Sequence, residues 1–395
     1  MRVGFYCPWV YVKGGLERTI LELRRRSRHQ WTVFTSHYDR EGTFPEFSEI
    51  GGVELPRVSV ERRNSAVLPA AARIATTKID LTNLDALVVG CDGLGSFVNF
   101  RNNARPLVCL CFTPLRAVYD EEYRARHLAA RGARRPFALA FERVYRSLDR
   151  LAWRRYAHTF CISETVKQRV VRGGLFPADA IELAHPGIDE SGIALSPVRE
   201  PFFFLPGRIM WTKNIELGIE AFLRCRPAKE RNFRLVIAGM VDAKSDPYRR
   251  WLQTLAEGHA EIEFICDPSD ARMDDLYRRC WATLFTAFNE DWGLTPLEAM
   301  RHGKPVIGVN RGGPTETIVH GESGLLANAD PDAFASAMGQ LVLDPGRTEL
   351  LGRFAIERAR CFTWRVFTDR VDDSLDRLVR RSAHPSAGSA DPLLP

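Results

Sequence analysis

Residues 288–300 of this chain read Phe288-Asn289-Glu290-Asp291-Trp292-Gly293-Leu294-Thr295-Pro296-Leu297-Glu298-Ala299-Met300. This stretch follows a strand-like apolar run, 281–285, and opens a short predicted helix. Pro296 suits the first helical position because its missing N–H is not needed there. Thr295 is then the N-cap and Glu298 completes a capping box. The backbone N–H groups of Gly293, Leu294 and Thr295 point outward with the positive end of the helix dipole, which predicts an anion site suited to phosphate.

Two carboxylates frame this predicted site, Glu290 before the turn and Glu298 inside the helix. Each has an ordinary explanation by itself, because Glu298 also reads as a helix cap and Glu290 as a solvated loop acid. Together with the amides they fit a nucleotide sugar. The amides would bind the diphosphate, one carboxylate the ribose hydroxyls and the other the sugar.

Two cations follow a second buried strand, 202–206. A turn at Gly207 leads to Arg208, and Lys213 precedes a predicted helix, 215–223. Arginine grips two phosphate oxygens and lysine acts as a point charge, so this pair also suits a diphosphate. Alone, the pair reads as surface cations near a helix start. Jointly with the two glutamates it favours a diphosphate site.

The spacing from Glu290 to Glu298 resembles the Glu-x7-Glu motif of retaining glycosyltransferases of family 4, in particular their mannosyltransferase-like members. Gly207-Arg208 with Lys213 matches the family's Gly-Arg plus Lys pair, and Gly14-Gly15-Leu16-Glu17 matches its Gly-Gly-x-Glu segment. The resemblance implies an α/β chain of the GT-B fold, with two Rossmann-like domains facing across a cleft. One departure is Phe112, which stands where these members usually carry a histidine, so that histidine's role is not carried over.

The resemblance also implies roles for individual residues. The activity would be retaining transfer of a hexose-type sugar from a UDP- or GDP-linked donor to a hydroxyl of a sugar, a lipid-linked or a small-molecule acceptor. We expect no cofactor and no metal ion, because no Asp-x-Asp metal site is indicated. The expected catalytic residues are Glu290, Arg208 and Lys213; the donor-binding residues are Gly15, Gly293, Leu294, Thr295 and Glu298; and Arg116 lies on the acceptor side.

Two other functions stay open at this point. A sugar-nucleotide epimerase of the same fold would act on the donor without an acceptor. A catalytically silent sugar-nucleotide binder is conceivable because of Phe112. A dehydrogenase is disfavoured, since the Gly-x-Gly-x-x-Gly fingerprint is absent.

The length of 395 residues favours two domains. We predict a Rossmann-like acceptor domain over 1–198 and a Rossmann-like donor domain over 199–363, joined by a Pro-containing polar linker at 196–201. A C-terminal helix over 364–381 is expected to return to the first domain, and the Ser-, Ala- and Pro-rich tail 382–395 to be disordered.

The charge and cysteine content of the chain limit which binding partners and cellular settings are expected. The net charge is only +6 and no dense basic tract is interleaved with aromatics, so nucleic acid is not expected. Residues 123–156 are rich in arginine with apolar residues at helical spacing; this region is either a solvated face or a peripheral contact with anionic lipid. Nine scattered cysteines without zinc-ligand spacing predict a reducing, cytoplasmic setting, with a peripheral position at the inner membrane face left open.

Overall fold

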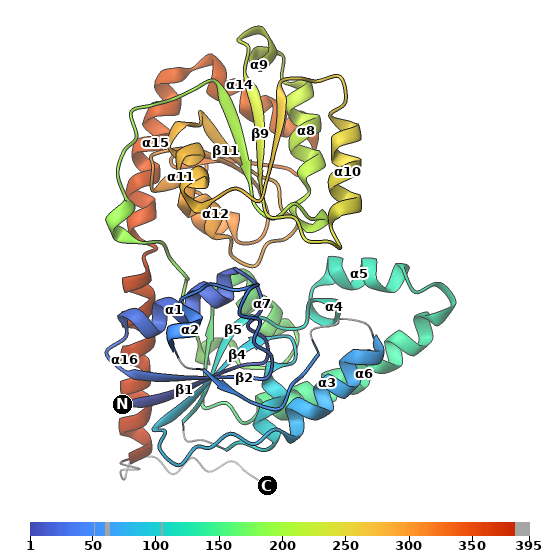
Figure 1. Cartoon of the computed structure of the whole chain (residues 1–395), viewed down its shortest axis with the longest axis vertical. Coiled ribbons are helices and arrows are strands. Elements are labelled where there is room, and N and C mark those ends of the chain that lie inside the picture. The colour runs from blue at the N-terminus through green and yellow to red at the C-terminus, as the bar shows by residue number, and fades with distance from the viewer. Residues whose placement is uncertain (51, 60–63, 104–105, 384–395) are drawn as a thin grey trace. The chain divides into compact units, whose positions relative to one another are not determined.

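Continuous apolar runs become buried parallel strands in both halves of the chain. Phe202, Phe203 and Phe204 are each at most 2% exposed, and Leu87 and Val88 are fully buried. Strands covered on both faces of a parallel sheet have this composition. The computed structural model describes residues 1–50, 52–59, 64–103 and 106–383, and Figure 1 labels its elements. They form two compact units, Met1–Ala184 with the segment from Phe367 onward, and His185–Val366.

The first unit contains a seven-stranded parallel sheet in the order β3-β2-β1-β4-β5-β6-β7. Its strands are β1 (Arg2–Cys7), β2 (Gln30–Thr35), β3 (Val53–Glu54), β4 (Ala86–Asp92), β5 (Leu107–Thr113), β6 (His158–Cys161) and β7 (Ile181–Leu183). Its helices are α1 (Gly15–Arg26), α2 (Phe47–Ile50), α3 (Asn64–Thr76), α4 (Arg116–Tyr119), α5 (Glu121–Ala129), α6 (Arg135–Trp153) and α7 (Glu164–Arg172), with short 3₁₀ turns at Gly95–Phe100, Gly132–Arg134 and Ala178–Ala180.

The second unit contains a six-stranded parallel sheet in the order β10-β9-β8-β11-β12-β13. Its strands are β8 (Phe202–Pro206), β9 (Arg234–Gly239), β10 (Ile262–Cys266), β11 (Ala282–Phe285), β12 (Val306–Val309) and β13 (Gly324–Ala327). Its helices are α8 (Ile215–Arg224), α9 (Arg226–Glu230), α10 (Asp246–Leu255), α11 (Asp270–Arg279), α12 (Leu294–Met300), α13 (Pro314–Thr317), α14 (Pro331–Leu343) and α15 (Pro345–Arg360), with 3₁₀ turns at Glu190–Gly192 and Trp211–Lys213. The predicted fold class, an α/β chain of two Rossmann-like domains, is confirmed.

The division between the units differs from the predicted boundary at 198/199. Ala194, predicted to lie in the first domain, and Ser196, predicted to lie in the linker, both pair with the second unit. The N–H groups of Ala194 and Ser196 donate to the carbonyls of Arg301 and His302, at 2.9 and 3.1 Å. Polar, proline-containing composition predicts a linker, but here the backbone groups find partners in the second unit, which therefore begins at His185.

The last helix, α16 (Trp364–Ala383), joins the first unit from Phe367 onward. Phe367, Val371 and Leu375 recur every four residues and are at most 1% exposed, so one face of the helix is buried. The remaining residues of the predicted tail, from 384 on, lie outside the described chain. No helix in the described ranges combines the length and apolar character needed to cross a bilayer.

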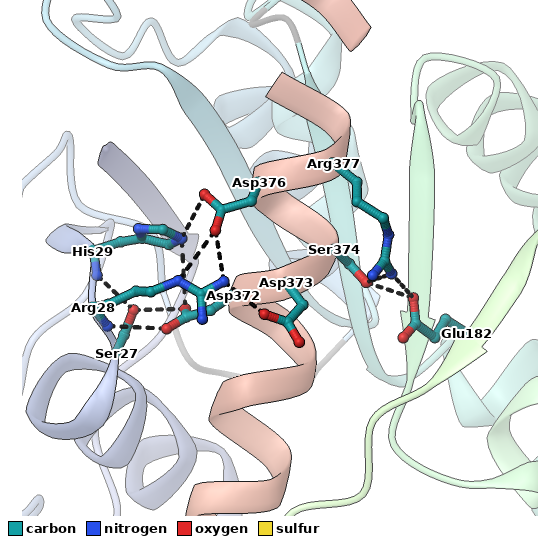
Figure 2. Close-up of polar contacts among 9 residues, drawn as sticks. All are labelled: Ser27, Arg28, His29, Glu182, Asp372, Asp373, Ser374, Asp376 and Arg377. Atoms are coloured by element: carbon teal, nitrogen blue, oxygen red, sulfur yellow. Dashed lines mark hydrogen bonds and ion pairs between the residues drawn. The ribbon is translucent and has the colours of Figure 1, made fainter. Parts of the chain in front are cut away.

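Polar contacts fix α16 on both sides (Figure 2). The buried carboxylate of Asp372 accepts the Ser27 hydroxyl at 2.7 Å and the Arg28 backbone N–H at 3.0 Å. On the opposite side, the Ser374 hydroxyl donates to Glu182 at 2.7 Å. Arg28 also pairs with the exposed Asp373 at 2.7 Å. Asp372 is 1% exposed, whereas the neighbouring Asp373 is exposed.

Replacing Asp372 should loosen α16 more than replacing Asp373. Asp372→Ala leaves a hydroxyl and an N–H without their acceptor, at a cost of roughly 1–3 kcal/mol, whereas an exposed ion pair contributes about 1 kcal/mol or less. Hydrogen exchange of the α16 amides is expected to accelerate about 5- to 150-fold in Asp372→Ala. Asp373→Ala is the matched control; equal acceleration in both variants would contradict this account.

Candidate functional site

The three predicted catalytic residues lie at the topological switch point of the second sheet, where the strand order reverses. β8 and β11 are adjacent, although β9 and β10 separate them in sequence. The loop after β8 carries Arg208 and Lys213, and the loop after β11 carries Glu290. Because the strands are parallel, both loops leave the carboxyl edge of the sheet, where open α/β sheets bind ligands.

Lys213 and Glu290 form an ion pair between the two loops. The Lys213 Nζ lies 2.6 Å from the Glu290 Oε2, and both side chains remain about one-fifth exposed. Two further bonds hold the loops together: the Thr286 hydroxyl donates to the Lys213 carbonyl at 2.7 Å, and the Phe288 N–H to the Thr212 carbonyl at 2.9 Å. The structure thus brings together two predicted site residues that are 77 positions apart.

Arg208 follows a turn at Gly207, whose φ is 134°. Its side chain is exposed, and within the described chain it makes no ion pair or hydrogen bond. It stands on the same loop as Lys213. The loop therefore presents one cation held by Glu290 and a second, solvated one.

The helix after the glutamate begins at Leu294, two residues earlier than predicted. Gly293, with φ 87°, is the N-cap of α12 and provides no side-chain cap. The prediction of Thr295 as N-cap, with Glu298 in a capping box, is wrong. Glu298 instead accepts a hydrogen bond from the Tyr277 hydroxyl at 2.8 Å. Burial and the nearby carboxylate raise the pKa of Tyr277 well above its ordinary value, so Tyr277 remains a donor.

The start of α12 nevertheless exposes backbone donors. Within the described chain, the N–H groups of Gly293, Leu294 and Thr295 have no hydrogen-bond acceptor. α12 has only seven residues, so its dipole is short and local amides would contribute most of any attraction for an anion. Among the described contacts, Glu298 has one partner, Tyr277, which occupies one of its oxygens.

The buried side chain of Trp292 anchors the loop between Glu290 and α12. This role was not predicted from the sequence. The indole is 3% exposed and donates to the Pro186 carbonyl at 2.8 Å. Its ring stacks on His185 at 4.5 Å, and His185 also lies 3.5 Å from Glu316. A Cβ on Gly313 would come within 2.1 Å of the Trp292 carbonyl, so only glycine fits there. A tryptophan directly after two loop acids, Glu290 and Asp291, was the available signal.

The first unit has its own hollow, at the corresponding edge of its sheet. The cavity has a volume of about 270 Å³ and follows the carboxyl ends of β1, β4 and β5, again at a change in winding direction. Most of its lining is apolar, with a few polar groups. Trp9, Leu94, Leu128 and Phe141 are among the apolar lining residues, and Asp92 and Glu142 are among the polar ones.

Arg116 lines this cavity, and its guanidinium lies 3.3 Å from Asp120 and 4.8 Å from the ring centre of Tyr123. Phe112 is buried in β5 and does not line the cavity. Gly15 is the first residue of α1, with Gly14 as N-cap. Of the predicted residues in this unit, only Arg116 is therefore a lining residue.

The loop before α1 is held by a buried carboxylate. Glu17 is 4% exposed, and its Oε1 lies 3.5 Å from the Tyr11 N. Burial raises the pKa of Glu17 to about 7, although nearby backbone N–H groups act in the opposite direction. A Cβ on Gly14 would come within 2.7 Å of the Glu17 Oε2, so this side chain folds back against the glycine turn.

Two possible metal-binding patterns receive structural explanations. Asp330-Pro331-Asp332 has the Asp-x-Asp spelling, but Asp330 caps α14 by accepting the N–H groups of Asp332 and Ala333. The sulfurs of Cys91, Cys109 and Cys111 lie within 4.8 Å of one another, a grouping created by the β4–β5 register.

Burial raises the pKa of Cys109 and Cys111 well above the ordinary value, whereas hydrogen bonds with these two thiols lower the pKa of Cys91, so two of the three sulfurs favour the neutral thiol over the thiolate that binds metals. We interpret the three cysteines as core packing.

Glu17 should make the first unit less stable as pH rises. Its folded pKa of about 7 exceeds its ordinary value of 4.5, so its stabilising contribution is complete below about pH 4.5 and is lost by about pH 7. The total is roughly 3 kcal/mol. At pH 8 the Glu17→Gln variant should have a larger free energy of unfolding than the wild type, measured by urea unfolding. The difference between the two proteins should shrink as the pH is lowered toward 5. Exposed Glu41→Gln is the control, and a pH-independent difference would contradict the assignment.

Two family models match the chain in succession. Residues 13–191 match the model described as Glycosyltransferase Family 4, and residues 189–358 match Glycosyl transferases group 1. The alpha-1,3/1,6-mannosyltransferase alg-2 of Neurospora crassa is 26% identical, covering 94% of this chain and 90% of that protein. The mouse alpha-1,3/1,6-mannosyltransferase ALG2 (Mus musculus) is 27% identical, covering 93% and 94%.

The fold is also that of a solved protein, Anabaena Alr3699/HepE in complex with UDP and glucose. The TM-score is 0.73 at 18% identity, covering 95% of this chain and 99% of that one. This likeness shows that the two parallel-sheet units form a GT-B fold. With family models matching from residue 13 to residue 358, the chain belongs to the glycosyltransferases of family 4.

Proposed function

We propose that this protein is a retaining glycosyltransferase that moves a hexose-type sugar from a nucleotide-diphosphate sugar to an acceptor hydroxyl. The observation that carries the proposal is the 2.6 Å contact between Lys213 and Glu290. It joins the loops after β8 and β11 into one site with a solvated arginine, free amides and two carboxylates.

The diphosphate would lie against Arg208, Lys213 and the N–H groups at the start of α12. When the bond from the sugar carbon to the diphosphate breaks, its electron pair passes to the diphosphate oxygen. Preorganised cations and amides stabilise that developing charge, and such stabilisation is usually the largest catalytic contribution. The Gly15 amide is a further proposed donor-side contact.

The carboxylates would have separate roles. Glu298, held by Tyr277, would accept hydrogen bonds from ribose hydroxyls. Glu290 would position the donor sugar and hold Lys213 near the diphosphate. The acceptor oxygen would attack from the face that the diphosphate leaves, without a protein nucleophile, and the acceptor's hydroxyl proton would pass to the departing diphosphate oxygen. We propose no cofactor and no metal ion.

The cavity of the first unit is the proposed acceptor site, with Arg116 in its wall. Its apolar lining with a few polar groups is typical of small-molecule sites. The acceptor would be a sugar, a lipid-linked compound or a small molecule. The names of the two mannosyltransferase relatives support a mannosyl donor, and the Anabaena complex supports UDP as a nucleotide to test. The proposed location is cytoplasmic.

Nucleotide binding should depend on Lys213. A ligand that binds only the native state raises the melting temperature, so UDP or GDP should raise it in the wild type. Lys213→Ala removes a charge-assisted contact worth about 1.5–3 kcal/mol, which weakens binding about 10- to 150-fold. Exposed Lys229→Ala is the control. Identical affinities in the two variants would remove Lys213 from the site.

Turnover should depend on Glu290. Glu290→Gln keeps the side chain's size but loses its charge, and kcat is expected to fall at least about 100-fold while nucleotide binding persists. Exposed Glu257→Gln should match the wild type.

The measurement is nucleotide release from UDP- and GDP-sugars with and without acceptors. Acceptor-dependent release supports transfer. Conversion of the donor alone would indicate an epimerase, and tight binding without turnover a silent binder.

A further inference from the structure

The outer face of α6 carries an apolar row that faces solvent. Phe137 is 78% exposed and Val144 60%, and Leu148 and Leu151 are more than two-fifths exposed. Their spacings of seven, four and three residues place them on one stripe of the helix. Isolated exposed apolar residues are ordinary, but a continuous stripe on one helix is the pattern of a helix that lies in a membrane interface.

The opposite face of α6 holds the helix in the fold without help from this row. Tyr145 and Trp153 are buried, and the Tyr145 hydroxyl donates to the Gly93 carbonyl at 2.9 Å. Asp149, 1% exposed, lies on this inner face. Burial raises its pKa well above the ordinary value, so it adds little negative charge to the helix. The outer stripe is therefore not required for packing within the unit.

The charge around the stripe is strongly positive. Residues 121–156 hold ten arginines against four acidic residues. Glu142 is neutralised by Arg124 and Arg146, at 2.8 and 2.9 Å. Arg143 and Arg154 are exposed and lie three helical turns apart on one flank of the stripe, and neither side chain has an ion pair in the described part of the chain.

We propose that the outer face of α6 docks on an anionic lipid bilayer, with Phe137, Val144, Leu148 and Leu151 at the acyl boundary and Arg143 and Arg154 among the phosphate headgroups. A helix binds lipid in this way through apolar burial and attraction of its basic residues to anionic headgroups. A protein partner is the poorer match, because a stable interface needs about 800 Å² per side, whereas one row of four side chains is narrow.

Docking through α6 would place the proposed acceptor cavity next to the lipid surface, because the same helix lines that cavity. The inner α6 residues Ala138, Phe141 and Glu142 line the cavity proposed for the acceptor. Figure 1 shows the α5–α6 pair reaching out from the sheet of the first unit. One helix would thus touch lipid on one side and form a wall of the cavity on the other. This link rests on the proposed function, whereas the docking itself does not.

Vesicle flotation of the full chain tests the docking without any nucleotide sugar. Vesicles of phosphatidylcholine mixed with phosphatidylglycerol should carry the wild type upward, and phosphatidylcholine alone should bind it at least about tenfold less. Phe137→Ser with Leu148→Ser should weaken binding to the anionic vesicles at least about tenfold. Leu343→Ser with Leu350→Ser, at exposed positions of the second unit, is the matched control and should bind like the wild type.

Arg143→Gln with Arg154→Gln should reduce the preference for anionic vesicles while the melting temperature stays unchanged. Equal binding of the Phe137/Leu148 variant and the wild type would overturn the proposal, as would a wild type that stays unbound with both vesicles. A concentration-dependent dimer that the Phe137/Leu148 variant abolishes, without vesicle binding, would assign the face to a second copy. Because nucleotide release is measured separately, failure of sugar transfer and failure of docking are distinguishable.

Discussion

The arrangement of the candidate site in the second unit depends on the ion pair between Lys213 and Glu290. Parallel pairing of β8 with β11 directs their two loops to the same edge of the sheet, but pairing alone leaves loops free to separate. The 2.6 Å contact, together with the bonds from Thr286 and Phe288, holds them as one surface. Glu290 also balances the charge of Lys213, which shares its loop with a second cation, Arg208. The proposed diphosphate would therefore meet two loops that are already held together.

The two units use the same architectural position for different chemistry. Each sheet reverses its winding direction once beside its first strand, at β1/β4 and at β8/β11. In the second unit this edge carries Arg208, Lys213 and two carboxylates, which suits a charged ligand. In the first it opens into a cavity with a mostly apolar lining. The fold supplies the location, and the side chains supply the selectivity.

The sequence predicted the strands at 202–206 and 281–285 and a joint site on the loops that follow them, because both follow from local pattern and from the geometry of parallel sheets. It failed where distant residues decide the outcome. Thr295 and Glu298 spell a capping box, yet Glu298 bonds to Tyr277, and a glycine with φ 87° begins the helix. The Trp292 anchor depends on His185, more than a hundred residues away.

The cysteine grouping and the cavity were also out of reach of the sequence. The sulfurs of Cys91 and Cys111 meet because of a strand register that no spacing reveals. The cavity is enclosed by segments from five separate parts of the first unit, and no single stretch of sequence describes it.

The connectivity of α16 has a consequence for synthesis on the ribosome. The first unit contains residues 1–184 and the segment from Phe367 onward, with the entire second unit between them. The buried row of Phe367, Val371 and Leu375 becomes available only after the entire second unit has been translated. Domains fold as units during synthesis. The second unit can therefore complete its core first, while the nascent N-terminal half waits with an apolar surface uncovered, which is a period when chaperones would be needed.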